Sequence, residues 1–212
     1  MLIKSLCIPK SKVVTLNEEV TLEEAIKILE DSGYRCVPVL DETGTIFRGN
    51  IYKMHIYRHK SRGGDMSLPV THLLKNATKY IHLKSSFIKV FFMIKDLPYI
   101  SVLDEKNRFF GIMTHGALLD VLEQSWSIDT GSFVLTIASP GDRGDLANIS
   151  RAINKYCSIS SCMILDVSPD HNIKRTITTL EPGVTKETIE LIKEHLDKKG
   201  YSVVEVEDLH NR

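Results

Sequence analysis

The sequence has no excess of either charge, since its 212 residues contain 27 Lys and Arg and 27 Asp and Glu. A protein that binds nucleic acid by neutralising phosphates normally carries a basic domain or face. The one local excess of basic residues, at positions 53–62, is interpreted as a solvated helix end. We therefore do not expect nucleic acid to be a partner.

Long hydrophobic runs are also missing. The longest apolar stretch, Phe87–Ile94, is interrupted by Lys89 and is much shorter than the roughly 20 residues of a membrane-spanning helix. The first ten residues lack the apolar core and small-residue cleavage site of a secretory signal. These absences predict a cytoplasmic protein with no membrane partner.

Cysteines are few, and Cys7, Cys36, Cys157 and Cys162 form no Cys-x-x-Cys pair. They are too sparse for a disulfide framework in a chain of this length, so we expect reduced thiols.

Motifs for metal binding and catalysis are missing as well. His55 and His59 lie four residues apart, but no HExxH pattern and no third ligand accompany them. The chain has no Gly-x-Ser-x-Gly, Walker or dinucleotide-binding glycine motif. The sequence predicts no metal, no cofactor and no enzymatic activity.

The strongest positive signal is an internal repeat. The segment YRCVPVLDE at residues 34–42 recurs as LPYISVLDE at residues 97–105, and a polar turn, an apolar strand and a glycine follow each copy. In the first copy Thr21 and Glu24 fit a capping box that opens a helix ending before Gly33. The second copy predicts its helix at residues 87–95. We expect two copies of one module, at residues 1–64 and 65–124.

After residue 124 the composition changes. Residues 125–131 are predicted to be a linker with Trp126 as a hydrophobic anchor. Hydrophobic periodicity then predicts strands at 133–138, 160–167, 173–180 and 202–206, and helices at 144–156 and 186–199. The order βαββαβ over residues 132–212 is typical of a ferredoxin-like fold. The chain is therefore predicted to belong to the mixed α+β or α/β class.

Two groups of motifs carry a family resemblance. The segments Val37-Pro38-Val39-x-Asp41 with Gly49, and Ile100-x-Val102-x-Asp104 with the sequence GIMT at residues 111–114, resemble a tandem pair of CBS domains, or Bateman module. The C-terminal unit, with the loop SPGDRGDL at residues 139–146, resembles an ACT domain. The combination resembles bacterial CBS-ACT proteins, among them cyclic-di-AMP-binding proteins and the acetoin-utilisation type.

The CBS resemblance implies that an adenosine-containing ligand binds between the repeats. Tyr34 would stack on the base, and Lys12, Arg35 and the Thr114 hydroxyl would meet phosphates. The residues implied for this cleft are Lys12, Val14, Tyr34, Arg35, Cys36, Val37, Pro38, Thr114 and His115. A second cleft would contain Tyr80, Pro98, Tyr99, Ile100 and Tyr52, where the Tyr52 ring replaces the usual Ser or Thr.

One departure from the family pattern bears on the ligand. The family's Thr-x-x-Asp motif places a carboxylate on the ribose diol, but here Ala117 stands at that position. A cyclic dinucleotide, whose 3′ oxygen is esterified, loses less by this change than AMP or ATP does. We therefore predict cyclic di-AMP (c-di-AMP) as the ligand. An ATP, AMP or S-adenosylmethionine sensor and a scaffold without a ligand are the alternatives.

The ACT resemblance implies a second candidate site. Asp142, Arg143, Gly144 and Leu146 lie at a helix start, where backbone amides could bind an amino acid. Alternatively, the loop is a structural helix start capped by Asp142, and the domain serves assembly through its sheet edges. The resemblance also implies a homodimer and a regulated partner protein that the sequence does not identify.

Overall fold

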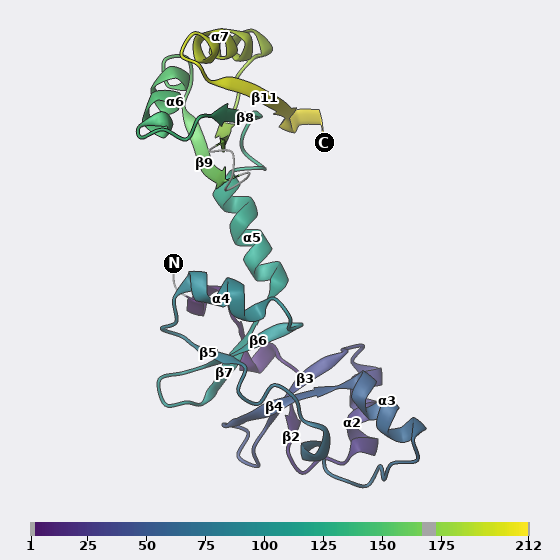
Figure 1. Ribbon diagram of the computed structural model, residues 1–212. Helices are drawn as coiled ribbons and strands as arrows, with labels where there is room; N and C mark the ends of the chain where they lie inside the picture. Colours follow the sequence, from purple (N-terminus) through teal and green to yellow (C-terminus); the bar gives the residue numbers. More distant parts are fainter. Residues whose placement is uncertain (1–2, 167–172, 212) are drawn as a thin grey trace. The chain divides into compact units, whose positions relative to one another are not determined.

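The computed structural model describes residues 3–166 and 173–211, and the chain divides into Met1–Leu119 (unit 1) and Asp120–Arg212 (unit 2) (Figure 1). Both units mix helices and strands, as predicted. Within the described residues, no helix is long and apolar enough to cross a membrane.

The first repeat consists of β2 (Leu16–Asn17), α2 (Leu22–Asp31), β3 (Cys36–Leu40), β4 (Phe47–Tyr52) and α3 (Lys53–Ser61). Its sheet has the order β2-β3-β4, with β2 parallel and β4 antiparallel to β3. The predicted capping box is confirmed, because Glu24 N donates to Thr21 Oγ1 and Thr21 N donates to Glu24 Oε2. The α2 helix therefore begins where the sequence places it.

The second repeat consists of β5 (Tyr80–His82), α4 (Phe87–Ile94), β6 (Tyr99–Leu103), β7 (Phe109–Thr114) and α5 (His115–Trp126). The helix predicted at residues 87–95 is thus confirmed. The register repeats as well: Val39 pairs with Gly49 in the first copy, Val102 pairs with Gly111 in the second, and a bulge follows each pair.

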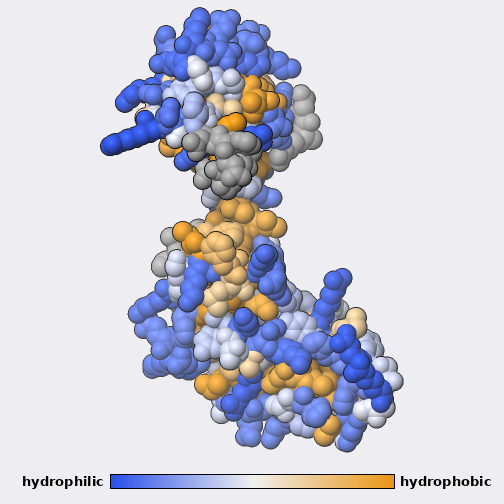
Figure 2. Space-filling view, viewed as in Figure 1, coloured by the Kyte–Doolittle hydropathy of each residue, from blue (hydrophilic) through white to orange (hydrophobic). Residues whose placement is uncertain are grey.

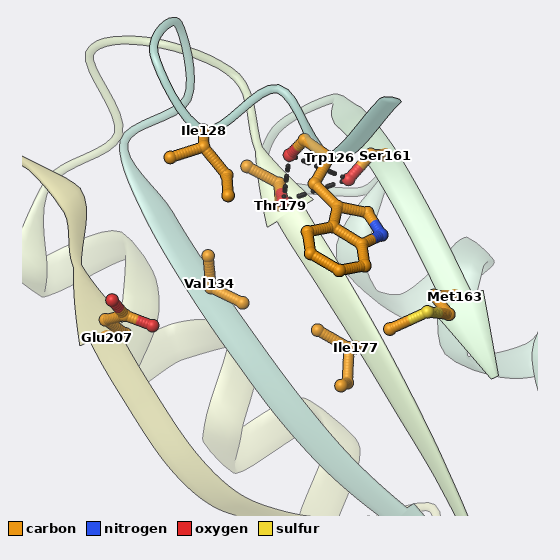
Figure 3. Close-up of a pocket in the computed structure, with 8 residues that line it drawn as sticks. All are labelled: Trp126, Ile128, Val134, Ser161, Met163, Ile177, Thr179 and Glu207. Atoms are coloured by element: carbon orange, nitrogen blue, oxygen red, sulfur yellow. Dashed lines mark hydrogen bonds between the residues drawn. The ribbon is translucent and has the colours of Figure 1, made fainter. Parts of the chain in front are cut away.

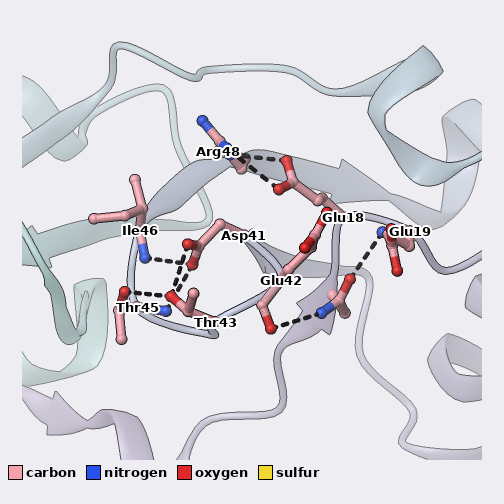
Figure 4. Close-up of polar contacts among 9 residues, drawn as sticks. Glu18, Glu19, Asp41, Glu42, Thr43, Thr45, Ile46 and Arg48 are labelled. Atoms are coloured by element: carbon pink, nitrogen blue, oxygen red, sulfur yellow. Dashed lines mark hydrogen bonds and ion pairs between the residues drawn. The ribbon is translucent and has the colours of Figure 1, made fainter.

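An aspartate fixes the turn after the central strand in each repeat. Asp41 Oδ1 accepts hydrogen bonds from the backbone N–H groups of Thr45 and Ile46, each at 2.7 Å. Nearby, Arg48 Nε lies 2.8 Å from Glu18 Oε2 (Figure 4). In the second repeat Asp104 Oδ1 accepts from the N–H groups of residues 106 and 108. The repeated aspartate is therefore explained by turn geometry.

The two repeats exchange the segments that precede them. Residues 3–12 form α1 (Ile3–Leu6), β1 (Ile8–Pro9) and η1 (Lys10–Lys12), and β1 pairs with β7 of the second repeat. Residues 66–74, which include η2 (Val70–Leu73), pack on the core of the first repeat. Gly111 permits the first exchange, because a Cβ there would lie 2.1 Å from the Ile8 carbonyl oxygen. In unit 1, therefore, each repeat packs against the segment that precedes the other repeat.

Unit 2 has the predicted βαββαβ order. It contains β8 (Phe133–Ser139), α6 (Asp145–Ile153), β9 (Ile159–Asp166), β10 (Lys174–Leu180), α7 (Lys186–Asp197) and β11 (Ser202–Asp208), followed by η3 (Leu209–Asn211). The antiparallel sheet has the ferredoxin-like order β11-β8-β10-β9. Residue 167, the predicted end of the second strand of this unit, lies outside the described residues. Helices α6 and α7 pack on the sheet through one core, which includes Leu135, Ile149 and Ile192.

The α5 helix extends into the predicted linker and ends at Trp126. The Trp126 carbonyl oxygen accepts hydrogen bonds from Ser161 Oγ at 3.1 Å and Thr179 Oγ1 at 2.7 Å. Figure 3 shows the indole against the strands that carry Met163 and Ile177, at a pocket of about 240 Å³. Trp126 is therefore attached to the sheet of unit 2 by its backbone as well as its ring.

Candidate functional site

A pocket of about 360 Å³ lies between the two repeats of unit 1 and is called the inter-repeat pocket below. Residues of β1 and η1, the segment from Gly33 into β3, and parts of β6 and β7 line it. These are Ile8, Lys12, Val13, Val14, Gly33, Tyr34, Arg35, Cys36, Val37, Pro38, Pro98, Tyr99, Ile112 and Thr114. Of the residues predicted for the first cleft, all except His115 are therefore brought together.

The backbone after α2 determines which predicted side chains are exposed. Gly33 has a φ of 71°, which an L side chain rarely adopts, and this residue turns the chain from the helix towards β3. Tyr34 and Arg35 lie in this turn, and Tyr34 remains 52% exposed. Cys36 begins β3 and is buried. The exposed Tyr34 ring and the Arg35 guanidinium thus lie next to the buried, mostly apolar residues that begin β3.

Strand pairing brings distant segments to the same pocket. Ile8 of β1 pairs with Ile112 of β7, so the chain that leads to Lys12 runs beside the second repeat. Thr114 ends β7, and its Oγ1 accepts a hydrogen bond from Ala117 N at 3.3 Å. This contact caps α5 and leaves the hydroxyl proton of Thr114 to donate to a ligand oxygen.

The electrostatics of the pocket favour an anion. Lys12 and Arg35 are exposed, and the lining contains no acidic side chain. Across residues 3–166 and 173–211, neither of these basic side chains forms an ion pair with a carboxylate. Two unpaired cations beside an apolar floor can hold phosphate oxygens, because charge-assisted hydrogen bonds strengthen away from bulk water.

A buried polar network joins the two repeats beneath the pocket. The Tyr99 hydroxyl donates to Asn50 Oδ1 at 2.7 Å and lies 3.6 Å from Cys36 Sγ. Burial raises the pKa of the Cys36 thiol to about 11 and raises the pKa of Tyr99 as well. Both groups are therefore protonated at neutral pH, and Cys36 is a poor nucleophile.

The five residues predicted for a second cleft are only partly brought together, since Tyr52 and Pro98 line one pocket of about 590 Å³ and the other three do not. Pro98 and Tyr99 line the inter-repeat pocket, while Ile100 has no exposed surface and belongs to the core of the second repeat. Tyr80 packs against a separate cluster between the repeats. The Tyr52 hydroxyl accepts a hydrogen bond from Asn76 Nδ2 at 2.7 Å, and burial raises the pKa of Tyr52 to about 12.

Sequence reasoning missed six lining residues of the inter-repeat pocket or assigned them elsewhere. The repeat itself could have indicated Pro98 and Tyr99, because Tyr99 pairs with Thr114 as Cys36 pairs with Tyr52. The remaining four are Ile8, Val13, Gly33 and Ile112. No local pattern marks Ile8, because its place depends on pairing with a strand about a hundred residues later.

The loop of unit 2 lines a pocket of about 320 Å³ to which Asp142, Gly144 and Leu146 contribute, whereas Arg143 does not. The α6 helix begins at Asp145 with Gly144 as its N-cap, so the cap predicted at Asp142 is wrong. Asp145 Oδ2 accepts hydrogen bonds from the N–H groups of Gly141 and Asp142. The N–H groups of Gly141 and Asp142 are therefore already used within the loop.

The histidines form aromatic contacts. The His55 ring lies 5.2 Å from the Tyr52 ring, and the His59 ring lies 5.6 Å from the His72 ring. Within the described parts of the chain, no group of three His, Cys, Asp or Glu side chains could hold a metal ion. All four cysteines there are free.

Residues 3–61 match the family model described as CBS domain. This segment of the chain is a CBS domain. It covers α1 to α3, which includes Lys12 and the segment from Gly33 to Pro38 in the inter-repeat pocket. No protein matched in the search of curated sequences.

Solved structures share the fold of more than half of this chain. A CBS domain-containing protein from Bacillus anthracis is 29% identical, with a TM-score of 0.52, and the match covers 58% of this chain and 93% of that one. CbpB in complex with c-di-AMP is 20% identical, with a TM-score of 0.53 and coverage of 58% and 85%. CBSX2 in complex with AMP is 14% identical, with a TM-score of 0.51 and coverage of 58% and 96%. The latter two similarities show the fold alone.

Proposed function

We propose that this chain is a non-enzymatic regulatory protein that binds c-di-AMP in the inter-repeat pocket. The observation that carries the proposal is the pocket's lining, in which Lys12 and Arg35 have no carboxylate beside them and Tyr34 offers an exposed ring. The fold supports it, since CbpB, which has the same fold, is in complex with c-di-AMP.

The choice of c-di-AMP over AMP or ATP rests on Ala117. Its backbone N–H donates to Thr114 Oγ1, and Thr114 lines the pocket, so Ala117 stands in the first turn of α5 at the position where the family pattern has a ribose-binding carboxylate. Linear nucleotides lose that hydrogen-bond acceptor, whereas a cyclic dinucleotide depends less on it. AMP remains the main alternative because CBSX2, of the same fold, is in complex with AMP.

We infer that ligand binding acts by a population shift that alters the surface available to a partner protein. Homodimer formation is also proposed, because α4 exposes Ile88 at 69% and Phe92 at 79%, and Figure 2 shows hydrophobic surface over this helix. Light scattering tests the dimer. A monomeric mass for the wild type, or an unchanged dimer in Phe92→Ser, would contradict this assignment.

The deciding experiment is calorimetric titration of the full chain with c-di-AMP, AMP, ATP and S-adenosylmethionine. We expect saturable c-di-AMP binding that Arg35→Ala weakens at least tenfold, which corresponds to about 1.4 kcal/mol. Arg58→Ala, an exposed change on α3 outside the pocket lining, is the matched control and should bind as the wild type does. Tight AMP or ATP binding without c-di-AMP binding would overturn the proposed ligand.

A panel of amino acids belongs in the same experiment, because unit 2 has its own loop pocket. A ligand that binds only the folded protein raises its melting temperature. A thermal shift with an amino acid and none with any nucleotide would move the proposed function to unit 2. No shift with any compound would favour a scaffold.

A further inference from the structure

A second pocket, of about 590 Å³, adjoins the inter-repeat pocket and is called the side pocket below. The two share Gly33, Arg35, Cys36 and Pro98 in their linings. They are therefore neighbouring parts of one cleft in unit 1, and Arg35 belongs to both.

The residues that line only the side pocket come from the end of β4 and from α3. Met54 is 64% exposed and Tyr57 is 42% exposed, which is unusual for apolar and aromatic side chains in a hollow. The Tyr57 hydroxyl donates a hydrogen bond to Glu30 Oε1 of α2, and this contact fixes the ring. The side pocket thus presents an anchored aromatic ring beside a flexible thioether, and both are suited to contact with a planar base.

The charges of the two pockets are also similar. Lys53 lines the side pocket as Lys12 lines the inter-repeat pocket, and neither lining contains a carboxylate. Lys53 Nζ donates to the Leu29 carbonyl oxygen at 3.4 Å, a long hydrogen bond that leaves further ammonium protons for a ligand. Each pocket therefore has one exposed tyrosine and one lysine of its own, and both have Arg35.

The sizes of the two pockets are compatible with one ligand that spans both. The volume of the inter-repeat pocket, about 360 Å³, is near the lower end of the roughly 300–1,000 Å³ of ligand sites. A mononucleotide could leave the side pocket empty. A ligand with two bases and two phosphates would place a base in each pocket and its phosphates near the shared cation.

We propose that the side pocket is the second base site for a cyclic dinucleotide: one adenine lies at Tyr34, the other lies at Tyr57 and Met54, and Arg35 binds the phosphates between them. This assignment rests on the proposed function, because it takes c-di-AMP as the ligand. It adds a specificity site, since a ligand with one base cannot contact both tyrosines.

The test is titration of the full chain with c-di-AMP and AMP, using Tyr57→Ala, Tyr57→Phe and Arg58→Ala. We expect Tyr57→Ala to weaken c-di-AMP binding about tenfold, within the range for loss of one base–aromatic stack. Tyr57→Phe keeps the ring but loses its hydrogen bond to Glu30, so it should lose much less affinity than Tyr57→Ala does. Arg58→Ala, the neighbouring exposed control, should retain wild-type affinity. AMP affinity should stay within about twofold of the wild type in all variants.

The outcomes separate this inference from the proposed function. If the wild type binds c-di-AMP and Tyr57→Ala binds it equally well, the side pocket is not a base site and the proposed function stands. An equal loss of AMP and c-di-AMP binding in Tyr57→Ala would also overturn the inference. If the wild type binds no c-di-AMP, both fall. If AMP does not bind measurably, the c-di-AMP affinities of the Ala and Phe variants decide.

A spectroscopic measurement on unaltered side chains checks the same contact. In protein labelled with ¹³C at the methionine methyl groups, the Met54 signal, assigned with Met54→Leu, should shift on saturation with c-di-AMP. It should move much less with AMP. A Met54 signal unmoved by saturating c-di-AMP would overturn the second base site.

Discussion

The Tyr99 hydroxyl of the second repeat donates a hydrogen bond to Asn50 Oδ1 of the first repeat over 2.7 Å, and both residues are buried. Removal of the Tyr99 hydroxyl leaves the buried Asn50 amide oxygen without a hydrogen-bond donor. A buried group left unsatisfied in this way costs about 1–3 kcal/mol. We expect Tyr99→Phe to lower the free energy of unfolding of unit 1 by that amount, measured in urea.

Tyr80→Phe is the matched control for this prediction, because Tyr80 is a partly buried tyrosine of the same repeat that packs in an apolar cluster. It should change stability by less than Tyr99→Phe. Equal effects of the two substitutions would show that the bond between the repeats contributes no specific stability.

Gly111 and Gly116 should respond to alanine in opposite directions. A Cβ at Gly111 would lie 2.1 Å from the backbone oxygen of Ile8, so Gly111→Ala must separate β1 from β7, at a cost of about 1–3 kcal/mol. Gly116 lies in α5, and a Cβ there would lie 3.8 Å from Thr114 Oγ1, an ordinary contact, so Gly116→Ala should stabilise the helix by up to about 1 kcal/mol. Thermal unfolding of both variants checks this, and destabilisation by both would contradict it.

The contribution of Asp41 to stability depends on pH. Hydrogen bonding, first from the Ile46 N–H, lowers the pKa of Asp41 from its ordinary 3.8 to about 2. A carboxylate whose pKa is depressed in the folded state stabilises it above the unfolded pKa, and this contribution is lost as pH falls from about 4 towards 2. Asp41→Asn should therefore lower the melting temperature at pH 6, and the difference from the wild type should narrow below pH 4.

Glu42→Gln provides the control for Asp41, because it removes the adjacent, exposed carboxylate. Its melting temperature should stay near that of the wild type across the same pH range. A deficit of Asp41→Asn that stayed constant from pH 6 to pH 2.5 would show that the carboxylate's charge does not hold the turn.

Lys12 and His115 should differ in their effect on c-di-AMP binding, although the family resemblance implies both. Lys12 lines the inter-repeat pocket and His115 does not. Lys12→Ala should weaken binding several-fold at low salt and reduce its salt dependence, because surface electrostatic attraction is screened by ions. His115→Ala should leave the affinity unchanged. Titration at two salt concentrations checks this, and a larger loss in His115→Ala would refute the assignment of the pocket.

Sequence patterns predicted the features that arise from contacts between neighbours in the chain. The capping box of Thr21 and Glu24 joins residues three positions apart, so its pattern predicted where α2 begins. The repeated aspartates, Asp41 and Asp104, bind turns within five residues. Hydrophobic periodicity likewise predicted the βαββαβ order of unit 2, because each strand and helix carries its own pattern of burial.

Which residues share a pocket depends on how distant segments of the chain pack together. Ile8 reaches the pocket through its pairing with Ile112, and the sequence gives no local sign of that register. The family resemblance implies a second cleft for Tyr99, whereas Tyr99 lines the inter-repeat pocket and hydrogen-bonds Asn50. The physical reason is that helix starts and turns form through short-range hydrogen bonds, whereas a pocket forms where segments distant in sequence exclude water together.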